Sequence, residues 1–184
     1  MEEISKDILL FKNEVPLRIV NTLNNLRATK DDIRFELNHH DREFTIFKKW
    51  WVESFEPIIM SYFLQYLVPE ENMFINEDGL KKYVKFKWRE MYYFRYTPES
   101  SVNSHRMLHW DFSQFTFVIC LTDDYEGGEL CFPRQNEKLK LSKGDIAFFP
   151  GGLTHPHYVN PTTKGIRDVL VGQILPQTQD HKID

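Results

Sequence analysis

The sequence of 184 residues predicts an α+β fold, mainly β, in which a small N-terminal helical layer supports an antiparallel sandwich or barrel. Three observations lead to this prediction. Helical periodicity is confined to the N-terminal half, and the rest of the chain consists of short apolar runs separated by turn residues. The composition, 41% hydrophobic and 15% aromatic, supplies the apolar mass of a folded core and excludes a disordered chain.

The N-terminal half combines a strand with helices. Ile8–Phe11 has the pattern of a strand, and Pro16 suits the first turn of a helix that continues to roughly Arg27. Pro57–Leu67 is apolar on most sides, which predicts a buried helix, whereas the aromatic-rich Phe44–Ser54 fits no single pattern. The expected apolar stripe of the first helix comprises Leu17, Ile19, Val20, Leu23 and Leu26.

From Tyr83 onward the apolar period changes to two, as in strands. Glycine-rich DDYEGG is expected to be the turn of a hairpin in which Cys120 and Cys131 face each other as two buried thiols. PTTKG is expected to be a second hairpin turn. The expected strands after Met91–Tyr96 are Phe115–Leu121, Glu129–Pro133, Lys138–Leu141, Ile146–Pro150, His157–Asn160 and Ile166–Leu175.

Several protein classes are excluded by composition. The longest apolar stretch, Pro57–Val68, spans about 12 residues, too few for a membrane helix. A net charge of -4 makes nucleic acid an unlikely partner, and two cysteines cannot form a disulfide framework. The acidic N-terminus lacks the basic region of a secretory signal, so we expect a soluble, cytoplasmic protein. The sequence carries no signal for an oligomeric state.

A basic stripe, Lys81–Arg89, raises the question of a nucleic-acid or acidic-peptide surface. Its lysines alternate with Phe86 and Trp88, as in a strand with one face in water and one in the core. We therefore interpret the basic residues as the solvated face of a strand. They are Lys81, Lys82, Lys85, Lys87 and Arg89.

His109-Trp110-Asp111 is a candidate metal site. On a strand, residues i and i+2 share a face, so the imidazole and the carboxylate could converge on one ion. The H-x-D spacing alone is weak evidence, because His39-His40-Asp41 repeats it in a polar segment that we expect to be an exposed turn or helix cap.

A third ligand is needed, and the two candidates are His155 and His157, which strand parity cannot separate. If His157–Asn160 and Ile166–Val169 form a hairpin over PTTKG, His157 faces Arg167 from the same side of the sheet. An inward guanidinium beside a metal requires an anionic partner. Two histidines, one carboxylate and a nearby arginine are the arrangement of a non-haem Fe(II) oxygenase.

The motifs HWD, GDIAFFPGGLTH and HYVNPTTKGIR resemble the double-stranded β-helix core of the 2-oxoglutarate/Fe(II) dioxygenases. More narrowly, they are similar to the prolyl-4-hydroxylase-like branch with its bacterial and viral members. The late motif of that branch, approximately H-x-V-x-P-V-T-x-G-x-R, is matched in register except that Thr162 stands where Val is usual. The resemblance covers Phe94–Leu175. It departs from the branch between Tyr96 and His109, where SSVNSHRML is longer than usual.

The resemblance implies roles for five residues. His109, Asp111 and His157 would hold Fe(II), and Arg167 would bind the far carboxylate of 2-oxoglutarate. Tyr96 would line the cosubstrate pocket. O2 would be the second cosubstrate, with ascorbate (vitamin C) as reductant, and Asp111 favours hydroxylation over the halogenation catalysed by related enzymes.

The implied function is hydroxylation of an unactivated C–H bond, first of all in a prolyl residue of a peptide or protein. The alternatives are a hydroxylase of a free amino acid or other small molecule, a non-oxidative cupin-like metal enzyme, and a binding protein with a vestigial site. We expect one domain over residues 1–184, with helical support and outer strands in 1–90, the catalytic β core in 91–176 and a tail in 177–184.

Overall fold

The computed structural model describes residues 2–5, 7–30, 32–67, 84–100 and 107–178. The N-terminal elements are β1 (Glu2–Ser5), β2 (Ile8–Phe11), α1 (Leu17–Ala28), β3 (Arg34–Glu36), α2 (Arg42–Trp50), the π-helical turn η1 (Trp51–Phe55), α3 (Glu56–Leu67) and β4 (Val84–Tyr96). The later strands are β5 (Phe115–Cys120), β6 (Tyr125–Gly127), β7 (Leu130–Phe132), β8 (Glu137–Leu139), β9 (Ile146–Pro150), β10 (Tyr158–Val159), β11 (Thr162–Gly165) and β12 (Arg167–Thr178).

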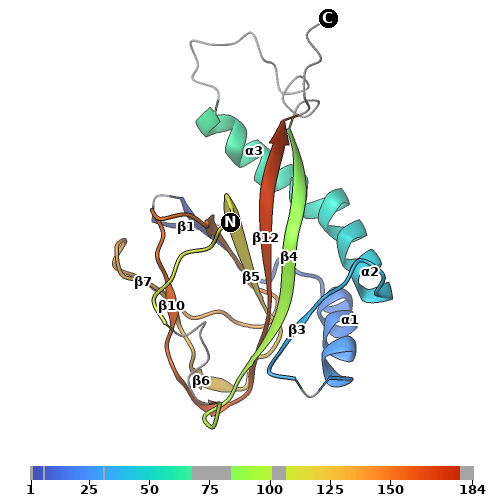
Figure 1. Cartoon of the computed structure of the whole chain (residues 1–184), viewed down its shortest axis with the longest axis vertical. Coiled ribbons are helices and arrows are strands. Elements are labelled where there is room, and N and C mark those ends of the chain that lie inside the picture. Colours follow the sequence, from blue (N-terminus) through green and yellow to red (C-terminus); the bar gives the residue numbers. More distant parts are fainter. Residues whose placement is uncertain (1, 6, 31, 68–83, 101–106, 179–184) are drawn as a thin grey trace, which may run out of the picture.

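These strands form one large and two small antiparallel sheets, so the mainly β prediction is confirmed. The large sheet has seven strands in the order β1-β2-β9-β5-β12-β4-β3. The small sheets have the orders β10-β7-β8 and β11-β6. Figure 1 shows the helices on one side of the long β4–β12 pair and the short strands β6, β7 and β10 on the other.

The helices cover the outer face of the large sheet. Side chains from α1, α2 and η1 pack against outward-facing residues of β4, β5, β9 and β12 in one apolar cluster rich in aromatic rings. Trp51, fully buried, lies 4.6 Å from the Phe117 ring. A Cβ at Gly172 would come within 2.1 Å of that Phe117 ring, so a glycine is required where the ring crosses β12.

A second apolar cluster fills the space between the large sheet and the short strands. It joins inward-facing residues of β4, β5, β9 and β12, among them Phe94 and Val169, to Leu130 and Phe132 of β7. The two clusters lie on opposite faces of the same strands because side chains alternate along a strand. The inner one surrounds the candidate site described below.

Both predicted hairpins are wrong. Tyr125–Gly127 of DDYEGG and Thr162–Gly165 of PTTKG are strands that pair with each other as β6 and β11. Gly127 and Gly165 adopt positive φ angles of 73° and 72° within these strands, which explains why they have the composition of turns. Consequently β10 pairs with β7, and β12 pairs with β4 and β5.

Cys120 and Cys131 therefore do not face each other across a hairpin. Cys120 lies on β5 of the large sheet and Cys131 on β7 of a small one. Both are buried free thiols, in agreement with the expectation of two core cysteines.

The N-terminal predictions hold for the elements and fail for some side chains. The strand Ile8–Phe11 and both helices are confirmed. Leu17 is 62% exposed, because α1 turns the face with Ile19, Val20 and Leu23 toward the sheet and leaves its first residue in water. Ile58 of α3 is 36% exposed, so the expectation of a fully buried helix is wrong at that position.

The basic stripe lies partly within the described residues. Lys87 and Arg89 are exposed, and Trp88 packs against the helix-side cluster, as expected for a strand with one solvated face. Lys81, Lys82 and the side chains of Lys85 and Phe86 lie outside the described residues. No helix in the described part of the chain is long and apolar enough to cross a membrane.

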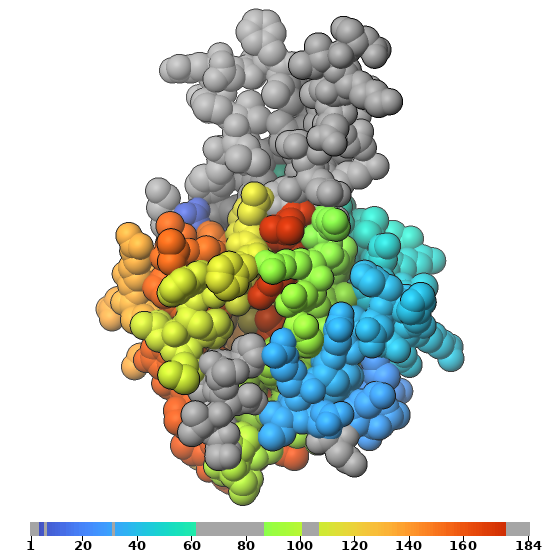
Figure 2. All heavy atoms as spheres, in the orientation of Figure 1, coloured from blue at the N-terminus to red at the C-terminus, as the bar shows by residue number. Residues whose placement is uncertain are grey.

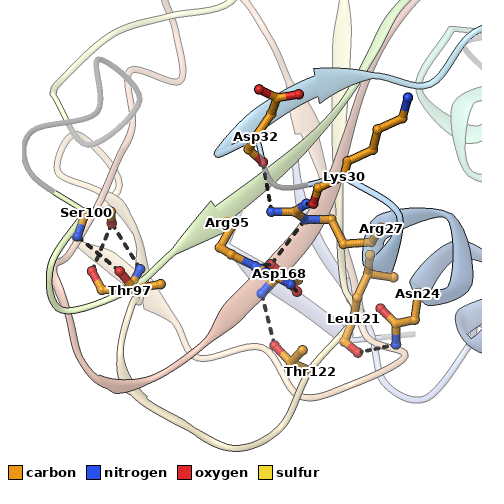
Figure 3. A network of polar contacts seen from close by, with 10 residues as sticks. All are labelled: Asn24, Arg27, Lys30, Asp32, Arg95, Thr97, Ser100, Leu121, Thr122 and Asp168. Atoms are coloured by element: carbon orange, nitrogen blue, oxygen red, sulfur yellow. Dashed lines mark hydrogen bonds and ion pairs between the residues drawn. The ribbon is translucent and has the colours of Figure 1, made fainter.

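A buried ionic cluster ties α1 to the central strands (Figure 3). Arg95 donates to both oxygens of Asp168, at 2.8 and 2.7 Å, and Arg27 Nε lies 3.5 Å from Asp168 Oδ1. The Arg27 guanidinium also donates to the carbonyls of Lys30 and Asp32. Because Arg27 and Asp168 are 1% and 4% exposed, the carboxylate compensates a charge that water cannot reach.

We expect Asp168→Asn to lower the free energy of unfolding by about 3 kcal/mol, since it leaves the buried Arg27 charge uncompensated. The measurement is urea denaturation. Glu126→Ala, which removes the exposed ion pair with Lys164, is the control and should change stability by less than about 1 kcal/mol. Equal effects of the two substitutions would contradict this role for the cluster.

Candidate metal and dicarboxylate site

Backbone hydrogen bonds bring the two halves of the candidate site together. His109 N donates to His157 O at 3.0 Å, and His157 N donates to His109 O at 2.8 Å. Asp111 N donates to Gly151 O at 2.7 Å. A Cβ at Gly151 would lie 2.7 Å from the backbone oxygen of Ser113, so this close approach requires a glycine.

His109–Asp111 is not a regular strand, which corrects the sequence-based expectation. It contains a single antiparallel bridge at His109, followed by irregular chain. The i and i+2 side chains nevertheless reach the same point. His39 and His40 of the competing H-x-D are exposed, and Asp41 accepts a hydrogen bond from Asn38 N before α2, as predicted for a turn or cap.

The donor atoms of His109, Asp111 and His157 all lie within 4.8 Å of one another. His109 Nε2 is 3.8 Å from Asp111 Oδ1, and His157 Nε2 is 3.7 Å from Asp111 Oδ2. Each distance suits two ligands of one metal ion better than a direct hydrogen bond.

The other ring nitrogens are held by backbone carbonyls. His109 Nδ1 lies 2.7 Å from Met107 O, and His157 Nδ1 lies 3.0 Å from His155 O. Since a carbonyl can only accept, we assign the proton of each neutral ring to Nδ1. This tautomer leaves both Nε2 lone pairs directed at Asp111, which is the arrangement that a metal ion requires.

Two further features prepare these side chains for a cation. Burial is the main cause that lowers the pKa of His157, and this keeps the ring neutral, although the Asp111 carboxylate acts in the opposite direction. Thr116 Oγ1, fully buried, donates to Asp111 Oδ2 at 2.6 Å and orients the carboxylate. Sequence reasoning missed Thr116, because a threonine in a strand carries no signal of its own.

His155, the alternative third ligand, is placed outside this cluster. Its Nδ1 lies 3.0 Å from the Thr154 hydroxyl, and its carbonyl accepts the hydrogen bond from His157. The ring is buried but does not line the cleft that holds the other three residues.

Arg167 lies in the same cleft as the two histidines, although the hairpin from which its position was predicted does not exist. Its side chain is 1% exposed, and its Nε and Nη1 have no hydrogen-bond partner among the described residues. Leaving a buried guanidinium without an anionic partner costs several kcal/mol. The position therefore calls for an anionic ligand.

Aromatic rings and a hydroxyl surround this guanidinium. Tyr96 is its cross-strand partner, with the ring centroid 5.1 Å from Arg167 Cζ, and the Tyr125 ring lies 6.0 Å away. Burial raises the pKa of Tyr125, whose hydroxyl donates to the Leu141 carbonyl. Thr162, at the motif position where the branch usually has valine, is buried with an unpartnered Oγ1. Tyr125 was not predicted from the sequence.

The three candidate metal ligands, Thr116, Tyr96 and Arg167 line one cleft. In Figure 2, atoms of β12 (red) are visible at the bottom of a hollow between β4 (green) and the chain leading to β5 (yellow). The lining combines the polar groups above with apolar side chains that exclude water. It comprises Arg34, Glu90, Tyr92, Phe94, Tyr96, His109, Asp111, Thr116, Val118, Leu130, His157, Val159, Arg167, Val169, Val171 and Gln173.

Sequence comparison finds partial relatives among hydroxylases. The chain is 38% identical over 98 residues to procollagen-lysine,2-oxoglutarate 5-dioxygenase 1 of Rattus norvegicus, covering 51% of this chain and 13% of that protein. It is 41% identical over 70 residues to a PKHD-type hydroxylase of Prochlorococcus marinus, covering 37% and 31%. The chain thus spans less than a third of the length of either relative. No protein-family model matches it.

Solved structures share the fold over nearly the whole chain. The viral collagen prolyl hydroxylase of Paramecium Bursaria Chlorella virus-1, in its 2-oxoglutarate complex, superposes with a TM-score of 0.64 at 16% identity, covering 95% of this chain and 98% of that one. A prolyl-4-hydroxylase of Pseudomonas putida gives 0.63 at 14% identity, covering 95% and 94%. The double-stranded β-helix fold is confirmed, and the resemblance to the prolyl-4-hydroxylase-like branch is supported by relatives in sequence and in structure.

We expect wild-type protein to bind Mn²⁺ or Co²⁺ at one site, and His109→Ala to weaken that binding about a hundredfold or more, since removal of a ligand exceeds the effect of outer-sphere substitutions. Isothermal titration calorimetry measures both affinities. His39→Ala, in the second H-x-D copy, is the matched control and should bind like wild type. Loss of binding in the control, or retention in His109→Ala, would place the ion elsewhere.

Proposed function

We propose that this chain is an Fe(II)- and 2-oxoglutarate-dependent oxygenase that hydroxylates an unactivated C–H bond, most directly in a prolyl residue of a peptide or protein. One observation carries the proposal. A single cleft combines three converging metal-donor atoms with a buried guanidinium that has no anionic partner in the described residues. The first feature suits a divalent metal ion, and the second suits a carboxylate.

The donor set fits Fe(II). Two imidazole nitrogens and one carboxylate leave coordination positions open, which is the pattern of non-haem Fe(II) oxygenases. His109, Asp111 and His157 would hold the ion. When bound, iron with 2-oxoglutarate and O2 supplies the oxidising power for C–H hydroxylation. We infer that ascorbate is the reductant that keeps the iron ferrous.

The chain's own residues position the reactants and exclude water. Arg167 would bind the far carboxylate of 2-oxoglutarate in the bidentate manner that a guanidinium favours, with Tyr96 covering it. Thr116 holds the Asp111 carboxylate in its orientation. Val118 and Val169 line the cleft with apolar surface, which strengthens the pairing of Arg167 with a carboxylate by excluding water.

The Arg167 guanidinium, which has no anionic partner in the described residues, also favours the proposed function over a non-oxidative metal enzyme or a vestigial site. A non-oxidative metal enzyme of this fold has no use for a buried carboxylate-binding fork, and a vestigial site has no reason to retain one that destabilises the fold. A prolyl substrate is favoured because the named neighbours in fold are prolyl hydroxylases. One of the relatives in sequence is named for procollagen lysine, so lysyl peptides belong in the assay.

We expect purified protein with Fe(II), ascorbate and 2-oxoglutarate to release succinate slowly without substrate, and faster with a substrate peptide. His109→Ala should show only the background without enzyme, because one iron ligand is missing. Succinate is quantified by mass spectrometry, together with gain of one oxygen atom on proline-rich peptides, lysine-containing peptides and free amino acids. Equal succinate release by wild type and His109→Ala would refute the proposed activity.

We expect Arg167→Met to leave the metal-free protein as stable as wild type or more stable, because it replaces an unpaired buried charge with an apolar side chain. The same substitution should abolish the rise in melting temperature that 2-oxoglutarate produces in wild-type protein. Thermal denaturation with and without 2-oxoglutarate and Mn²⁺ measures both effects. Unchanged stabilisation of the methionine variant by 2-oxoglutarate would show that the dicarboxylate binds elsewhere.

A further inference from the structure

The cleft extends beyond the residues that the proposed function uses. On the side of β3 and β4 its lining includes Arg34, Glu90 and Tyr92, and Gln173 lies opposite Glu90 on β12. None of these four belongs to the candidate metal or cosubstrate site. A C–H bond to be oxidised must lie beside the metal, so this outer part of the cleft is where the remainder of a substrate would lie.

Arg34 is the cation in this outer part of the cleft whose guanidinium N–H groups are available for a ligand. Its guanidinium carbon lies 3.9 Å from the centre of the Tyr92 ring and 5.4 Å from that of Phe94. It makes no hydrogen bond or ion pair within the described part of the chain. The ring contact uses the face of the guanidinium and leaves its N–H edges available.

The neighbouring charges are already paired. Arg89 donates through Nη1 to the Phe112 carbonyl, and its Nε lies 4.0 Å from Glu90 Oε1. Glu90 therefore has a cationic partner, whereas Arg34 has no anionic one. The uncompensated charge of the outer cleft is positive, which favours an anionic group on the substrate.

The backbone that leads into Arg34 is held in place before any substrate arrives. Arg27 donates to the carbonyls of Lys30 and Asp32, at 2.6 and 2.9 Å, and Arg95 N donates to Ile33 O at 2.8 Å. Figure 3 shows Arg27 reaching from α1 to the Lys30 and Asp32 carbonyls, just before β3 begins. The ordered backbone and the contact with the Tyr92 ring both restrict the Arg34 side chain, which then loses less entropy when a ligand binds.

We propose that Arg34 is a substrate-binding residue that pairs with a carboxylate of the peptide beside the hydroxylated position. The planar fork of a guanidinium matches a carboxylate with two hydrogen bonds. The carboxylate is an acidic side chain or the carboxyl terminus of the peptide. This subsite rests on the proposed hydroxylase function, since it names the substrate class of the same cleft.

The test is a binding titration, which requires no turnover. Fluorescein-labelled peptides with a central proline are titrated with the full chain loaded with Mn²⁺ and 2-oxoglutarate, and anisotropy gives the affinity. Three peptides carry amidated ends and differ in the residues flanking proline, which are glutamate, glutamine or lysine. A fourth has glutamine flanks and a free carboxyl terminus next to them.

We expect wild-type protein to bind the glutamate peptide or the free-carboxylate peptide about tenfold more tightly than the glutamine peptide, as for one charge-assisted hydrogen-bonded pair. The peptide that gains affinity identifies the source of the carboxylate. Arg34→Gln should remove the gain, Arg34→Lys should retain part of it, and Arg34→Glu should bind the lysine peptide best. Arg18→Gln, an exposed arginine of α1 outside the cleft, should behave as wild type.

Equal affinity of wild-type protein for all four peptides would overturn the proposal, as would a preference that persists in Arg34→Gln. The reversed preference of Arg34→Glu distinguishes charge recognition from simple damage to β3, because a damaged strand would lose affinity for every peptide.

The assay also distinguishes failure of the Arg34 subsite from failure of the proposed hydroxylase function. Wild-type protein that hydroxylates peptides without charge preference contradicts the Arg34 subsite, and protein that binds them with this preference yet releases no succinate contradicts the hydroxylase function.

Discussion

The site depends on the pairing of strand β12 along both of its edges, with β4 on one side and β5 on the other. Because side chains alternate along a strand, this pairing directs Arg167 into the cleft and Asp168 to the opposite face. Asp168 is then paired with Arg27 and Arg95, so Arg167 is the sequence neighbour of a buried ionic cluster. The same arginines hold the carbonyls that precede β3. One cluster outside the cleft thus supports the residues proposed to bind the two ligands within it.

The charge distribution of the cleft indicates which ligands would suit it. Its closed end presents a buried cation without an anion, Arg167, and its middle presents the Asp111 carboxylate between two imidazole lone pairs. Each of these two charges is unfavourable without a ligand. A ligand of opposite charge would compensate it. Arg34 is a second cation without an anionic partner in the described residues. Because Arg34 is exposed, water makes its charge far less costly than that of Arg167. A dicarboxylate, a divalent metal ion and an acidic peptide would therefore occupy successive positions.

The elements could largely be predicted from the sequence, and their pairing could not. Apolar periodicity located β2, α1 and most later strands, because it reports which residues are buried. It does not report partners: β6 and β11 have the glycine content of turns, yet they pair with each other across a long stretch of sequence. The candidate metal-ligand motif was recognisable because His109 and Asp111 are two residues apart and Arg167 completes a spaced motif with His157. Thr116 has its role through a side-chain contact with Asp111, and the role proposed for Arg34 depends on the pairing of β3 with β4. Apolar periodicity reports neither contact.

We propose that one cleft holds a metal ion and a dicarboxylate together. Anaerobic titration of Fe(II)-loaded protein with 2-oxoglutarate tests it most directly, by the weak visible absorption that arises when a 2-oxo acid chelates the iron. The matched ligand is 2-oxobutyrate, which has the same chelating end and lacks the second carboxylate. We expect both to produce the absorption, with 2-oxobutyrate requiring at least about thirtyfold higher concentration because it cannot pair with Arg167. No absorption with 2-oxoglutarate, or equal affinity for the two acids, would contradict the account.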